Sequence, residues 1–353
     1  MSNGFHRRSL LAAGGLLAMP WVHTARAQER AITLMAYSGL FEERYKAAVV
    51  EPFMRANSGI KVNYYGAPSS AQMLGMLRAQ KAAAQTNLCI MDLAVAKAGT
   101  DEGLYEAVDA GRLPVVKELQ PGAVVPGVAG PAVTFDNLVL LYAPGKVSPA
   151  PTSWRELWKP QYKGQIGIQA TPDIQGTALT LIANRLAGGE DYKRSVDKGI
   201  AMMGELAPSV QTWDPKPDPY TAVINGGLAL SIGWNARAQA FSAQAPDRLA
   251  VALPEEGSVF QINTLNLVKG APQTDAALAF MAHALGQEAQ KSFTESMFYA
   301  PTNARAPVAP EALARTAATP ERMAKMLDVD WIEVAKIRDA ITEQWRRRVI
   351  SRR

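Results

Sequence analysis

The stretch that decides the fold runs from Glu255 to Ala271 and reads EEGSVFQINTLNLVKGA. Its middle, Val259 to Val268, is rich in β-branched and aromatic residues and lies between glycine-containing turns, a pattern typical of a strand. Because side chains alternate between the two faces of a strand, Gln261 and Asn263 share a face with the leucines after them. That face begins polar and ends apolar. We therefore expect a strand that starts in a polar site and ends in a hydrophobic core.

The first 27 residues have the features of an export signal. Arg7 and Arg8 precede a short apolar run, and Ala25-Arg26-Ala27 fits small-residue cleavage. The apolar run is shorter than the ~20 residues that a membrane-spanning helix needs. The paired arginines resemble a twin-arginine (Tat) signal, and export by the Sec route remains an alternative. We expect a periplasmic protein with a cleavable signal.

Length and charge limit the classes that remain. The chain has 353 residues, and the part beyond the signal suits two domains of ~150 residues. The formal net charge is +5, and it falls to +2 without the signal, which carries three arginines and no acid. The basic tail WRRRVISRR accounts for that remainder, so a nucleic-acid partner is not indicated.

The scarcity of cysteine and histidine argues against several kinds of catalytic site. Cys89 is the single cysteine and lies in an apolar run, which predicts a buried, inert thiol. Two of the three histidines fall in the signal, leaving His283 in an apolar helical segment. A metal site built from His and Cys would need several ligands, and a Ser-His-Asp triad would have to use His283. We therefore expect no metal and no cofactor. A binding protein is favoured, and an exported enzyme that uses carboxylates alone stays open.

The order of patterns predicts an α/β fold. Apolar runs at 31–37, 60–67 and 87–95 alternate with helical patterns, as in a parallel sheet covered by helices. Ligands collect at the carboxyl ends of such strands, where this chain has Tyr37 and Ser38, then Ser70, then Asp92. A second series begins near residue 166. It includes a helix that starts near Thr177, after Asp173, and a turn at 233–235.

Two segments resemble a known family. The stretch PTSWRELWKPQYKGQIGI at 151–168 and the stretch from Pro254 to Asn303, which ends in YAPTN, resemble periplasmic solute-binding proteins of ABC importers. The similarity is greatest to the spermidine/putrescine-type branch. It implies the type II fold: two α/β lobes, a hinge of two strands at 135–143 and 259–268, and a ligand cleft between the lobes. We expect residues 28–140 and 264–353 to form lobe 1, and residues 141–263 to form lobe 2.

The same resemblance bears on the ligand. A polyamine needs carboxylates for its ammonium groups and aromatic faces for its stem. Trp234 lies in a Gly-Trp-Asn turn that matches the family and is expected to form an aromatic wall. Where the family has Phe-Trp-Met-Asp, this chain has Phe260-Gln261-Ile262-Asn263, so the stacking Trp and the ammonium-binding Asp are replaced by amides. The preference for polyamines is thereby weakened, although Asp92 and Asp173 remain to supply charge.

These observations give one working hypothesis. The chain is expected to be a monomeric substrate-binding component that captures a small polar, polyamine-like solute and delivers it to the permease subunits of an ABC importer. A ligand sensor for a non-transport partner is a further alternative. Some of the candidate ligand-binding residues also fit simple roles in capping helices or packing the lobes. The candidates are Tyr37, Ser38, Ser70, Asp92, Asp173, Thr177, Trp234, Asn235, Gln261, Asn263 and Tyr299.

Overall fold

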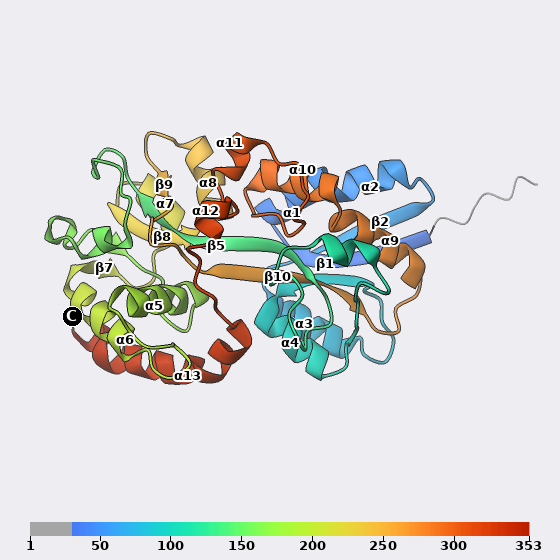
Figure 1. Ribbon diagram of the computed structural model, residues 1–353, viewed down its shortest axis with the longest axis horizontal. Helices are drawn as coiled ribbons and strands as arrows, with labels where there is room; N and C mark the ends of the chain where they lie inside the picture. Colours follow the sequence, from blue (N-terminus) through green and yellow to red (C-terminus); the bar gives the residue numbers. More distant parts are fainter. Residues whose placement is uncertain (1–29, 353) are drawn as a thin grey trace, which may run out of the picture.

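The computed structural model describes residues 30–352 and shows two groups of elements at opposite ends of an elongated molecule (Figure 1). Two long strands, β5 (Ala132–Tyr142) and β10 (Phe260–Val268), lie side by side across the middle and join the groups (Figure 1). The strand order through the molecule is β2-β1-β3-β10-β5-β8-β6-β7. The predicted two-lobe α/β architecture and its two-strand hinge are confirmed.

The first lobe is built on parallel strands. β1 (Arg30–Tyr37) pairs in parallel with β2 (Ile60–Ala67) and β3 (Leu88–Asp92), and β10 adds to β3 in the antiparallel direction. The short β4 (Tyr105–Glu106) pairs with the end of β10. The helical segments of this lobe are α1 (Leu40–Tyr45), η1 (Lys46–Val50), α2 (Glu51–Ala56), α3 (Ser70–Ala79), α4 (Leu93–Asp101), η2 (Pro114–Glu118), α9 (Thr274–Ala284) and α10 (Gln287–Met297).

Leu265 and Leu267 show how β10 enters the first lobe. Both are buried in one apolar cluster with Leu34, Phe280 and other residues of β1, β3, α9 and α10. Burying an aliphatic side chain of this size contributes about 1.5–3 kcal/mol. The leucine end of β10 is therefore fixed in the first core, as its sequence predicts, and the amide end is left at the boundary between the lobes.

The second lobe uses the far half of β5. That half pairs with β8 (Leu230–Trp234) and β9 (Ala250–Ala252), and β8 continues to β6 (Ile166–Gly167) and β7 (Val210–Thr212). The helical segments here are η3 (Trp154–Trp158), η4 (Pro160–Tyr162), α5 (Ile174–Leu186), α6 (Asp197–Leu206), η5 (Ala207–Ser209), α7 (Pro219–Ile224) and α8 (Asn235–Gln244). Helix α5 is buried along its length from Gln175 to Asn184, so it forms the centre of this lobe.

The C-terminal part of the chain returns to the second lobe. After α11 (Pro310–Leu313) and α12 (Pro320–Met323), α13 (Trp331–Arg348) packs beside α6 and is followed by η6 (Ile350–Arg352). The Trp345 ring nitrogen donates to Thr180 Oγ1 at 2.7 Å. The expected assignment of all of 264–353 to lobe 1 is therefore wrong for α13. The apolar stripe of this helix, which includes Trp345, is buried in the second core.

No helix within residues 30–352 is long and apolar enough to cross a membrane. The predicted export signal lies outside the described residues.

Candidate functional site

A cavity of about 250 Å³ opens where the hinge strands pass between the lobes, and we call it the interlobe cavity. This volume lies just below the ~300–1,000 Å³ common for pockets that bind small molecules, so the cavity suits a solute of few atoms. It is lined by Tyr37, Phe41, Pro68, Asp136, Asp173, Gln175, Trp234, Arg237, Gln261, Asn263 and Tyr299.

The two amides of β10 lie in this cavity. Asn263 is 1% exposed, donates from Nδ2 to Thr134 Oγ1 at 2.9 Å and accepts from the Tyr37 hydroxyl at 2.9 Å. Gln261 Nε2 donates to Asn263 Oδ1 at 3.2 Å. Since buried amides need partners, these bonds explain why the polar end of the strand is tolerated. Asn263 therefore orients its neighbours at the polar end of the strand.

A hydrogen-bonded network continues from Tyr37 along the edge of the first-lobe sheet. The hydroxyls of Tyr37 and Ser70 are 2.7 Å apart, and Ser70 Oγ accepts from the backbone N–H of Asp92 at 3.0 Å. Burial raises the pKa of the Tyr37 hydroxyl, so Tyr37 stays neutral. The structure brings together the strand ends that the sequence placed along one edge.

Asp92 lies behind the cavity wall. One carboxylate oxygen accepts from the backbone N–H of Ala94 at 3.0 Å and caps α4. The other accepts from Gln261 Nε2 at 3.4 Å. Burial raises the pKa of the Asp92 carboxyl, while these hydrogen bonds lower it. Its contacts position Gln261, and Asp92 does not itself line the cavity.

Asp136 is a carboxylate at the cavity that the sequence reasoning missed. It lies on β5 directly opposite Gln261 on β10 and is 2% exposed. One oxygen accepts from the backbone N–H groups of Asn137 at 2.9 Å and Ala236 at 3.1 Å. Burial raises the pKa of Asp136 to about 7, against the lowering effect of these bonds and of the positive charge of Arg237.

Arg237 is the cation of the cavity and was also missed. It lies in the first turn of α8, three residues after Trp234, and its side chain is exposed. It forms no ion pair within 4.0 Å with any carboxylate among residues 30–351. A planar guanidinium with free donors is well suited to bind a carboxylate through two hydrogen bonds. Arg237 is thus available to an anionic group of a ligand.

The loop before α5 supplies the remaining polar wall. Asp173 accepts from the backbone N–H of Gln175 at 2.8 Å and caps the helix, while its side chain stays exposed at the cavity. Gln175 is 8% exposed, and its amide oxygen is buried without a hydrogen-bond partner among the described atoms. Such an unsatisfied group is rare and calls for a partner. Gln175 also lines the cavity.

Several predicted residues lie away from the cavity. Thr177 is buried in α5 and its hydroxyl donates to the Asp173 carbonyl at 3.3 Å. Asn235 is fully buried and donates to the carbonyls of Phe298 and Arg315 at 3.0 and 2.9 Å. Ser38 bonds through its backbone to Ala67 at 3.0 Å. The predicted residues that line the cavity are Tyr37, Asp173, Trp234, Gln261, Asn263 and Tyr299.

The cavity, the hinge and the two lobes agree with a comparison to known families. The sequence pattern of the bacterial extracellular solute-binding proteins matches residues 48–324. The chain belongs to this family. It is 26% identical over 306 residues to the gamma-aminobutyric acid-binding protein of Pseudomonas aeruginosa, covering 82% of this chain and 81% of that one. It is also 26% identical over 328 residues to the spermidine/putrescine-binding periplasmic protein of Escherichia coli, covering 86% and 87%.

The solved structures agree on the fold. An ABC transporter protein from Clostridium perfringens superposes with a TM-score of 0.73 at 22% identity, covering 90% of this chain and 99% of that one. The chain is therefore the solute-binding component of an ABC transporter. Proteins of this kind bind small solutes and interact with permease subunits, and the family is periplasmic or extracellular.

Proposed function

We propose that the interlobe cavity binds a small zwitterionic amine, of the ω-amino acid class, and that the closed protein delivers it to a membrane permease. One observation carries this proposal: Arg237 and Asp136 line the same small cavity, and Arg237 has no carboxylate partner there. Arg237 binds the carboxylate of the solute. Asp136, in its ionised form, and the aromatic faces of Trp234 and Tyr299 stabilise the ammonium group.

A polyamine fits this wall less well. It carries a cation at each end, and one end would face the like charge of Arg237, which is unfavourable at short range. Gln261 and Asn263 are neutral, so the β10 side of the cavity supplies no carboxylate to offset that repulsion. Among relatives, one is named for gamma-aminobutyric acid and another for spermidine and putrescine. Asp136 and Asp173 both attract ammonium groups, but an amino acid also brings a carboxylate to Arg237, so the charges in this cavity favour the first kind of ligand.

Calorimetric titration of the mature chain with gamma-aminobutyric acid, putrescine and spermidine tests the proposal. We expect the amino acid to bind most tightly. Replacing Arg237 by Gln is expected to weaken amino acid binding at least tenfold and to leave putrescine binding unchanged or tighter. Arg55→Gln, an exposed change on α2, is the matched control and is expected to have no effect. Tighter binding of putrescine than of any amino acid to the unaltered chain would contradict the proposal.

We further propose that the chain acts as an exported monomer and binds without turnover. His283 supports the absence of turnover, because its ring nitrogen lies 3.0 Å from the Val49 carbonyl and burial lowers the pKa of the imidazole. Val49 belongs to the first core, so His283 packs against that core. Recovery of an unchanged solute in a 1:1 ratio from a single folded chain is the expected result. Conversion of the solute would favour a carboxylate-dependent enzyme, and stable binding without any effect on uptake would favour a sensor.

A further inference from the structure

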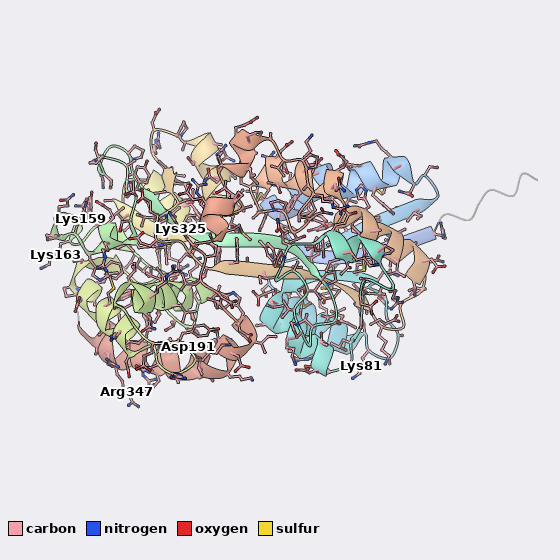
Figure 2. All side chains as sticks on the ribbon, in the orientation of Figure 1. Lys81, Lys159, Lys163, Asp191, Lys325 and Arg347 are labelled. Carbon is pink, nitrogen blue, oxygen red and sulfur yellow. The ribbon has the colours of Figure 1, made fainter. Side chains whose placement is uncertain are left out.

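A second cavity, of about 290 Å³, lies on the opposite face of the hinge, and we call it the hinge-back cavity. Side chains alternate along a strand, so Asn137 on β5 points away from the face that carries Asp136. Asn137 lines the hinge-back cavity, whereas Asp136 lines the interlobe cavity. The segment 317–326, which contains α12, lines this cavity together with β5, and Lys325 of that segment is labelled in Figure 2. The two cavities are therefore separate sites.

Asn137, which lines the hinge-back cavity, carries a buried acceptor without a partner among the described residues. Asn137 is 2% exposed, and its Oδ1 forms no hydrogen bond with any described atom. Its Nδ2 makes one long bond, 3.4 Å, to the Leu138 carbonyl. A buried carbonyl oxygen left unpaired costs about 1–3 kcal/mol, so a donor in the cavity would stabilise the protein.

The two cations around the cavity have protein partners, whereas one of the two carboxylates has none in the described part of the chain. Lys325 pairs with Glu321 at 3.4 Å, and Arg322 donates to the carbonyls of Ala314 and Thr316. Both cations are thus engaged within the protein. The Glu255 side chain is exposed at the cavity and forms no ion pair within 4.0 Å in the described part of the chain. The cavity therefore offers an uncharged acceptor inside and a free carboxylate at its mouth.

We propose that the hinge-back cavity binds a small primary amine. The ammonium group donates to Asn137 Oδ1 and is neutralised by Glu255, because it is a group with three donors and one positive charge. A short alkyl chain lies against Leu253 and Met326, the apolar part of the wall. Glu255 is the charged group of the lining without a protein partner in the described structure, so we expect a cation to bind more tightly than an anion.

Amide spectra of the ¹⁵N-labelled mature chain during titration with n-butylamine test this site directly. We expect shifts at Asn137, Gly257 and Ser258, and none there with sodium butyrate. Glu255→Gln is expected to weaken the response at least tenfold. The control, Glu205→Gln, makes the same chemical change at an exposed position on α6 and is expected to leave the response unchanged.

Three results would overturn the proposal. The first is the absence of shifts at these three amides, or shifts confined to the interlobe cavity. The second is equal weakening by both glutamate changes, which would indicate a loss of general negative charge. The third is a crystal structure with n-butylamine in which only water bonds to Asn137 Oδ1. None of these results depends on which solute fills the interlobe cavity, so failure here leaves the proposed transport function intact.

Discussion

The two walls of the interlobe cavity differ in how their polar groups are satisfied. On the first-lobe side, Tyr37, Ser70 and Asn263 bond to one another and to Thr134. On the second-lobe side, Arg237 has no carboxylate partner and the Gln175 amide oxygen has no hydrogen-bond partner in the part of the chain that the structure describes. One wall is complete without a ligand and the other is not.

This difference predicts that the two walls have different roles when the lobes close on a solute. A preformed wall can bind a solute with little loss of side-chain freedom, whereas unsatisfied groups gain their partners only when the solute is present. A ligand biases a two-state hinge only through contacts that differ between the two states. Under the proposed function, Arg237 and Gln175 are expected to make the contacts that favour the closed form. Changes to the first wall are expected to alter stability, and changes to the second wall are expected to alter affinity.

The largest effect is expected from breaking the complete wall. Asn263→Ala removes one of the two partners of the Tyr37 hydroxyl, which keeps Ser70, and removes the side-chain partner of Thr134 Oγ1. A buried polar group left unsatisfied costs about 1–3 kcal/mol, and the loss of the amide also leaves a space. We expect the free energy of unfolding in urea to fall by about 2–4 kcal/mol. Asn225→Ala, an exposed change after α7, is expected to stay within about 0.5 kcal/mol. Equal effects of the two changes would contradict the network.

An effect that depends on pH is expected from Asp136, which lies between the walls. Its pKa is raised to about 7 in the folded chain from an ordinary 3.8, so the folded state binds its proton more tightly than the unfolded state. This contribution to stability is therefore present near pH 4 and is lost as pH rises through about 7. Asp136→Asn should remove that part of the pH dependence. Urea unfolding of both chains between pH 4 and 8 measures it, and identical pH profiles would contradict the assignment.

The sequence was most informative where a strand ended. Tyr37, Trp234 and the amides of β10 line the cavity. They could be predicted because the carboxyl ends of parallel strands and the polar end of a hinge strand form local sequence patterns. The burial of the leucine end of β10 could likewise be predicted from the alternation of its side chains. These features need only neighbouring residues to be recognised.

The missed residues depend on pairing between distant segments. Asp136 stands inside a long apolar run and becomes part of the site only because β5 pairs with β10 in one register. In the sequence, Arg237 cannot be distinguished from any other charged residue on an exposed helix face. Only the folded structure places it at the interlobe cavity. Asn235 shows the opposite error: it comes directly after Trp234, yet its side chain turns to the carbonyls of Phe298 and Arg315. The orientation of one side chain at the start of a helix is set by tertiary contacts that a local motif does not contain.

The smallest effect sharpens the difference between the walls. Gln175→Ala removes an amide whose oxygen has no partner in the described structure, so the ligand-free chain is expected to unfold at a free energy within about 0.5 kcal/mol of the unaltered one. If the amide bonds the solute in the closed form, affinity falls several-fold, as expected for the loss of one hydrogen bond of about 1 kcal/mol. Urea unfolding without ligand and calorimetric titration with it measure the two quantities separately. A clear loss of stability with unchanged affinity would show that this residue belongs to the core of the second lobe and not to its binding wall.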